Sequence, residues 1–357
     1  AAAILYSGTS LTIVATNIYS GISKFLLLAI PFFVLSGNIM AKAGISTRLI
    51  RFVDTCVGHR KGGIANVCII VACFFGAISG SGPATVAALG AVLIPAMVER
   101  GGFSAAFSTA LMATSSSIAI VIPPSIAFVV YASITGVSIG DMFMAGIIPG
   151  ILMGLALVVV VMLEVRRNHV MPSNVEKASA KERWNAFKDA FWGFLMPIII
   201  LGGIYGGFFT PTEAAAVSVV YGLFVGMVIY KEVKFKDLWE ILIDSAKTTG
   251  GIMLIIGAAT LFSYVCTVFG IAQAAQALLL EISGNKYIFL LIVNVIFLIA
   301  GCFVDANSAM YIFIPIMYPV ATQLGIEPVH FGVIATVNLA IGQVTPPVGV
   351  NLFVAIG

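Results

Sequence analysis

Charged residues are scarce in this chain. Asp, Glu, Lys and Arg make up 9% of the 357 residues, and only three residues are histidine. A soluble globular protein typically carries about 25% charged residues, so the composition excludes that class. The formal net charge of +3 is too small to indicate an acidic partner, and we expect no nucleic-acid partner.

Motifs for metal binding and catalysis are also missing. The five cysteines show neither CxxC nor Cys/His spacing, which argues against a zinc site and against a disulfide framework. The sequence has no GxxxxGK[ST] loop, so the chain does not itself hydrolyse ATP. No nucleophile and base, and no metal pair, share one depth of an apolar segment. We therefore expect no enzyme and no catalytic residues.

Apolar residues are abundant. They form 60% of the sequence and give a mean hydropathy of +1.11. Several apolar runs approach or exceed the roughly 20 residues that span a bilayer. The composition predicts an all-α polytopic membrane protein whose main partner is the lipid bilayer. The chain begins without Met and ends inside an apolar run, so we expect truncation at both ends.

The placement of Lys and Arg predicts the topology. We assume that two segments, 63–98 and 286–321, turn back inside the membrane instead of crossing it. All but two of the 18 Lys and Arg residues then lie on one side, and the exceptions are Lys24 and Lys286. Cytoplasmic loops carry an excess of basic residues, so we predict two re-entrant hairpins that enter from opposite sides.

Each hairpin is followed by a long apolar segment with a Pro-Pro pair inside it. The first segment, 103–132, contains Pro123-Pro124, and the second, 331–357, contains Pro346-Pro347. The second proline removes a helical hydrogen-bond donor and disfavours the α conformation before it, which frees carbonyl groups. We predict two broken helices with free carbonyls at membrane depth, although two proline kinks that only shape packing are the alternative.

The hairpins and broken helices recur at an offset of roughly 220 to 226 residues, which is typical of an inverted repeat. We predict a first repeat at 1–141, scaffold helices with a cytoplasmic linker at 142–230, and a second repeat at 231–357. The second repeat lacks a counterpart of 142–164, which indicates truncation at the C-terminus. Residues 173–190 and 234–247 mix aromatic with charged residues and predict helices in the membrane interface, with a soluble connector as the alternative.

Polar side chains gather where each hairpin turns. The first turn offers Ser79, Ser81 and Thr85, and the second offers Asp305, Asn307 and Ser308. Such oxygen ligands suit an alkali or alkaline-earth cation.

Asp305 is a lone carboxylate within a long apolar stretch. It is a candidate cation ligand, a hydrogen-bonded helix cap that holds no ion, or a proton carrier. Further polar residues flank the breaks, where they could contact substrate or bond back to the helix: Ser115 to Ser117, Asn338, Gln343, Thr345 and Asn351.

Five segments in this order resemble the large membrane subunit of the tripartite ATP-independent periplasmic (TRAP) transporters. They are GAISGSGPATVAALGAVLIPAM, IPPS, TPTEAAA, DANSAM and QVTPPVGVNLF. The resemblance covers nearly the whole chain. It implies an elevator-type, Na+-driven importer of organic acids such as C4-dicarboxylates or sialic acid, located in the bacterial inner membrane. It also implies a soluble periplasmic substrate-binding protein and a small four-helix membrane subunit as partners.

The resemblance further implies two or more Na+ ions. One site would combine Ser79 and Ser81 with carbonyls from Val121 to Pro123. The other would combine Asp305 and Asn307 with Gly342 and Thr345. The organic acid anion would lie between the hairpin turns and the breaks, near Gly82, Thr85, Ser125, Ser308, Pro347 and Asn351.

Two other types of membrane protein are compatible with parts of the pattern. A stand-alone Na+-coupled carboxylate carrier would use the same hairpins without a binding protein. A channel would need a continuous polar pore, which paired re-entrant breaks do not favour.

Overall fold

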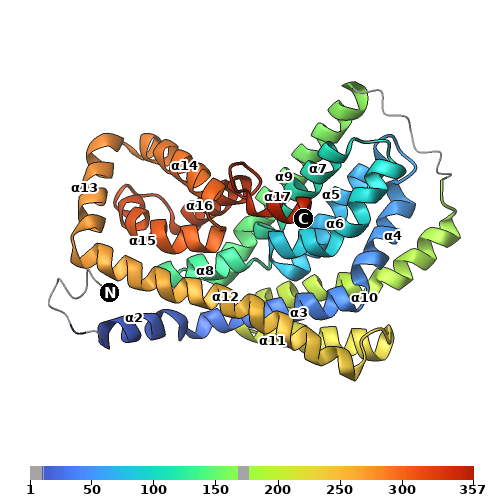
Figure 1. Cartoon of the computed structure of the whole chain (residues 1–357), viewed down its shortest axis with the longest axis horizontal. Helices are drawn as coiled ribbons and strands as arrows, with labels where there is room; N and C mark the ends of the chain where they lie inside the picture. The colour runs from blue at the N-terminus through green and yellow to red at the C-terminus, as the bar shows by residue number, and fades with distance from the viewer. Residues whose placement is uncertain (1–9, 11, 168–176) are drawn as a thin grey trace.

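The computed structural model describes residue 10, residues 12–167 and residues 177–357, and all regular structure within them is helical (Figure 1). Seven of the described helices are long and apolar enough to cross a membrane. The prediction of an all-α, multi-pass membrane protein is therefore confirmed. Parts of the predicted first repeat and of the predicted linker lie outside the described residues.

One order of helices occurs twice in the chain. A helix leads to a left-handed glycine and a further helix, then to a helical hairpin, and finally to a helix that stops before a Pro-Pro pair and resumes after it. The first copy contains α3 (Ala29–Lys42), α4 (Ile45–Val57), α5 (Gly63–Ser79), α6 (Gly82–Glu99), α7 (Ala105–Ser117), η2 (Ile118–Ile120) and α8 (Ile126–Thr135). The second contains α12 (Phe235–Val268), α13 (Ile271–Ser283), α14 (Lys286–Phe303), α15 (Ala306–Gln323), α16 (Pro328–Gly342) and α17 (Val350–Ile356).

The corner before α4 and α13 is built in the same way in both copies. Gly44 has a φ of 68° and Gly270 a φ of 70°, a left-handed conformation that glycine adopts without a steric cost. Each glycine is the residue from which the next helix starts. The opposite insertion of the two copies in a bilayer remains a prediction.

The helices form two layers (Figure 1). The base layer contains α3 and α12 with four further elements: α2 (Thr12–Ile22), η1 (Phe25–Leu28), α10 (Ala180–Tyr205) and α11 (Pro211–Phe224), which η3 (Val225–Ile229) extends. The core layer contains the two hairpins, the two broken helices and α9 (Ile139–Arg167). The α4 and α13 helices connect the layers at opposite ends of the molecule.

The position of α9 differs from the predicted scaffold at 142–230. This helix packs mainly against α5, α8 and α16 of the core layer, whereas α10 and α11 lie in the base layer. Two glycines four residues apart explain the difference: an added Cβ would lie 2.4 Å from Phe128 at Gly146 and 2.3 Å from Ile122 at Gly150, whereas at Gly154 it would make an ordinary contact, 3.4 Å from Cys73. Small residues at this spacing let helices approach closely, so α9 belongs to the core layer.

The polar segments predicted as interfacial helices are parts of longer helices. Residues 173–176 lie outside the described residues, but α10 runs without interruption from Ala180 to Tyr205 and begins with a capping box formed by Ser179 and Glu182. Residues 235–247 form the first turns of α12, which continues to Val268. Where they are described, both segments are therefore continuous with the apolar helices that follow them, and their position in the membrane interface stays a prediction.

Candidate functional site

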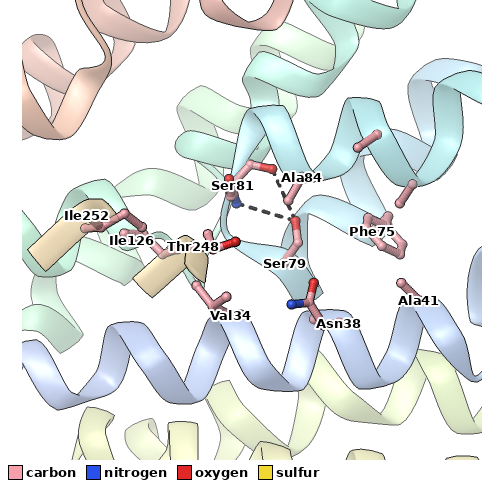
Figure 2. A pocket seen from close by; sticks show the side chains of 13 residues that line it. Val34, Asn38, Ala41, Phe75, Ser79, Ser81, Ala84, Ile126, Thr248 and Ile252 are labelled. Atoms are coloured by element: carbon pink, nitrogen blue, oxygen red, sulfur yellow. Dashed lines mark hydrogen bonds between the residues drawn. The ribbon is translucent and has the colours of Figure 1, made fainter. Parts of the chain in front are cut away.

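The turn of the first hairpin gathers three oxygen atoms. The α5 helix ends at Ser79, Gly80 is left-handed, and Ser81 is the residue before α6. The Thr85 hydroxyl donates to the Ser81 carbonyl at 2.8 Å and lies 2.9 Å from the Ser79 hydroxyl, which is itself 3.3 Å from that carbonyl. Figure 2 shows Ser79 and Ser81 facing each other at this turn. The predicted residues of the first turn therefore form one largely buried oxygen cluster.

The turn of the second hairpin is organised by Asp305. Its carboxylate caps α15, accepting from the backbone N–H groups of Asn307 at 3.0 Å and Ser308 at 3.3 Å, and also from the Ser308 hydroxyl. Asn307 Oδ1 is buried and has no hydrogen-bond partner within the described chain. Asp305 thus caps α15, its further role as a cation ligand or proton carrier stays a prediction, and an unpartnered amide oxygen lies two residues away.

At the first break, carbonyl groups that leave the helical hydrogen-bond pattern contact other groups of the chain. The buried Ser125 hydroxyl donates to the Ile120 carbonyl and accepts from Phe128 N–H at 3.3 Å, which caps α8. A Cβ added at Gly146 of α9 would lie 2.4 Å from the Val121 carbonyl oxygen, so this oxygen lies against α9. Ser125 therefore holds the break together from inside the core.

Each hairpin is bonded to the broken helix of its own copy just after the Pro-Pro pair. In the first copy, Ile126 N–H donates to the Gly80 carbonyl at 3.3 Å. In the second, Val348 N–H donates to the Cys302 carbonyl at 3.0 Å. The α14 and α16 backbones also touch, because a Cβ added at Gly342 would lie 2.5 Å from Gly301 Cα. Hairpin and break thus form one unit in each copy.

The second half of each broken helix packs on the hairpin of the other copy. The α8 helix contacts α15 of the second hairpin, and α17 contacts α6 of the first hairpin as well as α7, the first half of the other broken helix. Asn351 of α17 is fully buried, and a Cβ added at Gly82 would lie 2.6 Å from its amide nitrogen. Neither polar atom of the Asn351 side chain has a hydrogen-bond partner among the residues described. Gly82 and Asn351, both predicted to bind substrate, therefore meet although they are far apart in sequence.

Two cavities of about 390 Å³ each lie between the layers. The first is lined by Asn38 of α3, Ser79 of the first turn and Thr248 of α12, among others (Figure 2). The second reaches both hairpin turns, and its polar or charged lining residues are Ser81, Lys247, Thr248, Asp305, Asn307 and Gln343. The cavities share Ser81, Ile126, Thr248 and Ile252, so they adjoin, and each volume suits a small organic molecule.

Some of the predicted site residues line the two cavities, and others do not. Ser79, Ser81, Gly82, Asp305 and Asn307 line one or both cavities. The remaining predicted residues line neither of these two cavities: Thr85, Val121, Pro123, Ser125, Ser308, Gly342, Thr345, Pro347 and Asn351.

The predictions from the sequence did not include the contribution of α12 to the second cavity. Lys247 and Thr248 line the second cavity, yet Lys247 counts in the topology prediction only as one more basic residue at a helix end. The available signal was its position as the last charged residue before the apolar run from 248 to 268. Gln343 also lines this cavity, and its Oε1 atom is buried without a hydrogen-bond partner in the described part of the chain.

Comparisons with known proteins agree on one family. A family model described as the DctM component of the tripartite ATP-independent periplasmic transporter matches residues 1–357. The chain is 43% identical to the C4-dicarboxylate TRAP transporter large permease protein DctM of Pseudomonas aeruginosa over 98% of this chain and 82% of that protein. It is 38% identical to the sialic acid TRAP transporter large permease protein SiaM of Vibrio cholerae, again over 98% and 82%.

A solved structure shares the fold. The YdaH transporter of Alcanivorax borkumensis superimposes with a TM-score of 0.63 at 14% identity, covering 97% of this chain and 80% of that one.

Proposed function

The chain belongs to the DctM family of TRAP transporters, and on this basis we propose that it is the membrane permease of a Na+-coupled importer of organic acid anions. It would act in the bacterial inner membrane together with a soluble periplasmic binding protein and a small four-helix membrane subunit. Relatives in this family are transporter permeases and not enzymes.

One observation carries the proposal: both hairpin turns reach the same cavity between the two layers. Ser81 and Gly82 come from the first turn and Asp305 and Asn307 from the second. Polar groups and helix ends inside apolar segments are costly in a membrane unless they line a cavity or bind a ligand. The cavity is therefore the best candidate for the place where ion and substrate meet.

The donor groups at the second turn fit an alkali cation. Asp305 supplies a carboxylate, and Asn307 supplies a buried amide oxygen without a partner within the described residues. Hard oxygen ligands of this kind suit Na+ better than a transition metal. Gly342 and Thr345 of the neighbouring break would complete the site, and Ser79 and Ser81 would hold a second ion at the first turn.

The class of substrate is proposed from the relatives. One relative is named for C4-dicarboxylates and another for sialic acid, and both substrates are carboxylic acids. We propose carboxylate transport, with these two acids as the first candidates; another relative, 42% identical, is named for isethionate, a sulfonate.

The arrangement in two layers supports an elevator mechanism. The cavities lie between a base layer that contains α3 and α12 and a core layer that contains the hairpins and breaks. If the core layer slides along the base layer, the ion and substrate residues travel with it, and access changes from one side of the membrane to the other.

Uptake into proteoliposomes tests the proposal. The complete complex is reconstituted and supplied with binding proteins loaded with succinate or sialic acid, with and without an inward Na+ gradient. Uptake that needs both the gradient and a binding protein is expected. Uptake unaffected by removal of Na+ would overturn the coupling, and uptake without any binding protein would favour the stand-alone carrier.

A further inference from the structure

The lining of the second cavity contains two charged side chains, and they come from different layers. Asp305 belongs to the second hairpin turn in the core layer, and Lys247 belongs to α12 in the base layer. No ion pair joins them within the chain as the structure describes it. The lining of the cavity therefore includes one basic and one acidic residue, each from a different layer.

Lys247 is available for a ligand. Its ion-pair partner is Asp244, three residues earlier on the same helix, at a distance of 3.3 Å. The two side chains are 74% and 58% exposed, so solvent screens the pair and it holds the ammonium group only weakly.

The face of α12 that lines the cavity has one charge, at one end. Lys247 is followed on the lining by Thr248, Gly251, Ile252 and Ile255, none of which is charged. From residue 248 to the end of α12 the sequence contains no Asp, Glu, Lys or Arg. A lysine at the end of an apolar helix can extend toward lipid headgroups, but this one lines a cavity that faces both hairpin turns.

Lys42 offers a comparison. It also lies at the end of an apolar helix of the base layer, and it pairs with Glu240 at 3.2 Å. It lines neither cavity. The difference between the two lysines is therefore their position relative to the cavity, since both have an exposed carboxylate partner.

We propose that Lys247 binds a carboxylate group of the transported anion from the base layer, opposite the hairpin turns. This inference rests on the proposed function, because it specifies how the same cavity selects an anion. Without Na+, the negative charges of Asp305 and of the exposed Asp244 offset the charge of Lys247, so the cavity would attract an anion little. When Na+ neutralises Asp305, the charge of Lys247 remains, so ion binding favours anion binding.

The position of Lys247 also makes this contact dependent on the state of the transporter. The hairpin turns would move with the core layer, whereas α12 stays in the base layer. The anion would contact Lys247 only while the hairpin turns lie beside this part of α12. The affinity of the transporter for the anion would therefore differ between the two sides of the membrane.

Chemical modification of lysine in the intact complex tests the inference without requiring transport. The rate of acetylation at Lys247 and at Lys42 is measured by mass spectrometry, with Na+ present, in the presence of succinate or sialic acid. We expect at least one anion to slow modification of Lys247 fivefold or more and to leave Lys42 unchanged. Replacing Na+ with choline should abolish this protection. Absence of protection by both anions, or equal protection of both lysines, would overturn the inference.

Transport kinetics provide the second measurement. Lys247→Gln should raise KM for the protective anion tenfold or more, Lys247→Arg should recover most of this loss, and Lys42→Gln should match the wild type. An unchanged KM in Lys247→Gln would contradict the inference. Protection of Lys247 without Na+-driven uptake would support the anion site and refute the proposed transport. Na+-driven uptake with neither protection of Lys247 nor a change in KM would support the proposed transport and refute the anion site.

Discussion

Asp305 combines a structural role with a proposed ionic one, and two substitutions separate them. Asp305→Ala removes the cap of α15 and should cost about 1 kcal/mol of stability, whereas Asp305→Ser keeps a capping oxygen and should cost less. Both variants lose the carboxylate, so both should need roughly tenfold more Na+ for half-maximal uptake, which corresponds to about 1.4 kcal/mol. Thermal unfolding and uptake at varied Na+ measure the two effects. If uptake by Asp305→Ser depended on Na+ as it does in the wild type, Asp305 would act only as a helix cap.

Ser125 and Ser104 cap helices in different surroundings. Ser104 is exposed and accepts from Phe107 N–H at 3.2 Å, so its loss exposes that donor to solvent. Ser125 is fully buried and also satisfies the Ile120 carbonyl. We expect Ser104→Ala to cost about 0.5 to 1 kcal/mol and Ser125→Ala about 2 to 3 kcal/mol, because a buried carbonyl is left unpaired. Denaturation of both variants side by side provides the measurement, and equal losses would show that the carbonyl finds another donor.

The sequence predicted the residues of the hairpin turns better than those of the breaks. Asp305 and Ser81 could be found because polar residues are conspicuous in apolar segments. The bond of Ser125 to the Ile120 carbonyl could not, because it depends on the backbone geometry of the break. The meeting of Gly82 with Asn351 could not either, since it depends on how distant helices pack. Lys247 was missed for the same reason: its cavity forms only when α12 lies beside both turns.

At the scale of helices, the close contact of α14 with α16 leaves no room for a side chain. A Cβ at Gly301 would lie 2.9 Å from Gly342 Cα and 3.2 Å from the Leu339 carbonyl oxygen, which are backbone atoms. We expect Gly301→Ala to cost about 1 to 3 kcal/mol by overpacking and to impair uptake, because the hairpin must shift away from its break. Gly202→Ala is the control: nothing lies within 4 Å of its added Cβ, and it should be neutral or slightly stabilising. Similar melting temperatures for the two variants would contradict the predicted contact.

The sequence also predicted most helix positions, because apolar runs, Pro-Pro pairs and left-handed glycines are local signals. It placed α9 in the wrong layer, although the glycines at 146, 150 and 154 recur every four residues. That spacing predicts a close helix contact but does not say with which helix. The sequence did not show that the polar first turns of α10 and α12 continue into the apolar helices, because a polar stretch resembles an interfacial segment until its continuity is known.

At the scale of the whole molecule, the two layers predict that one disulfide will stop transport and another will not. A Cβ added at Gly37 of the base layer would lie 3.6 Å from Ser79 Cβ in the core layer, within the roughly 3.5 to 4.5 Å typical of disulfides. We expect the oxidised Gly37→Cys/Ser79→Cys variant to lose uptake, because sliding requires these layers to separate. Dithiothreitol should restore uptake to the rate that the same variant shows before oxidation. Gly154→Cys is the control, since its Cβ would lie 3.4 Å from the native Cys73 Sγ within the core layer. Its disulfide should leave uptake unchanged, as should oxidation of the wild type. Undiminished uptake by the oxidised pair between the layers would refute an elevator motion along this boundary.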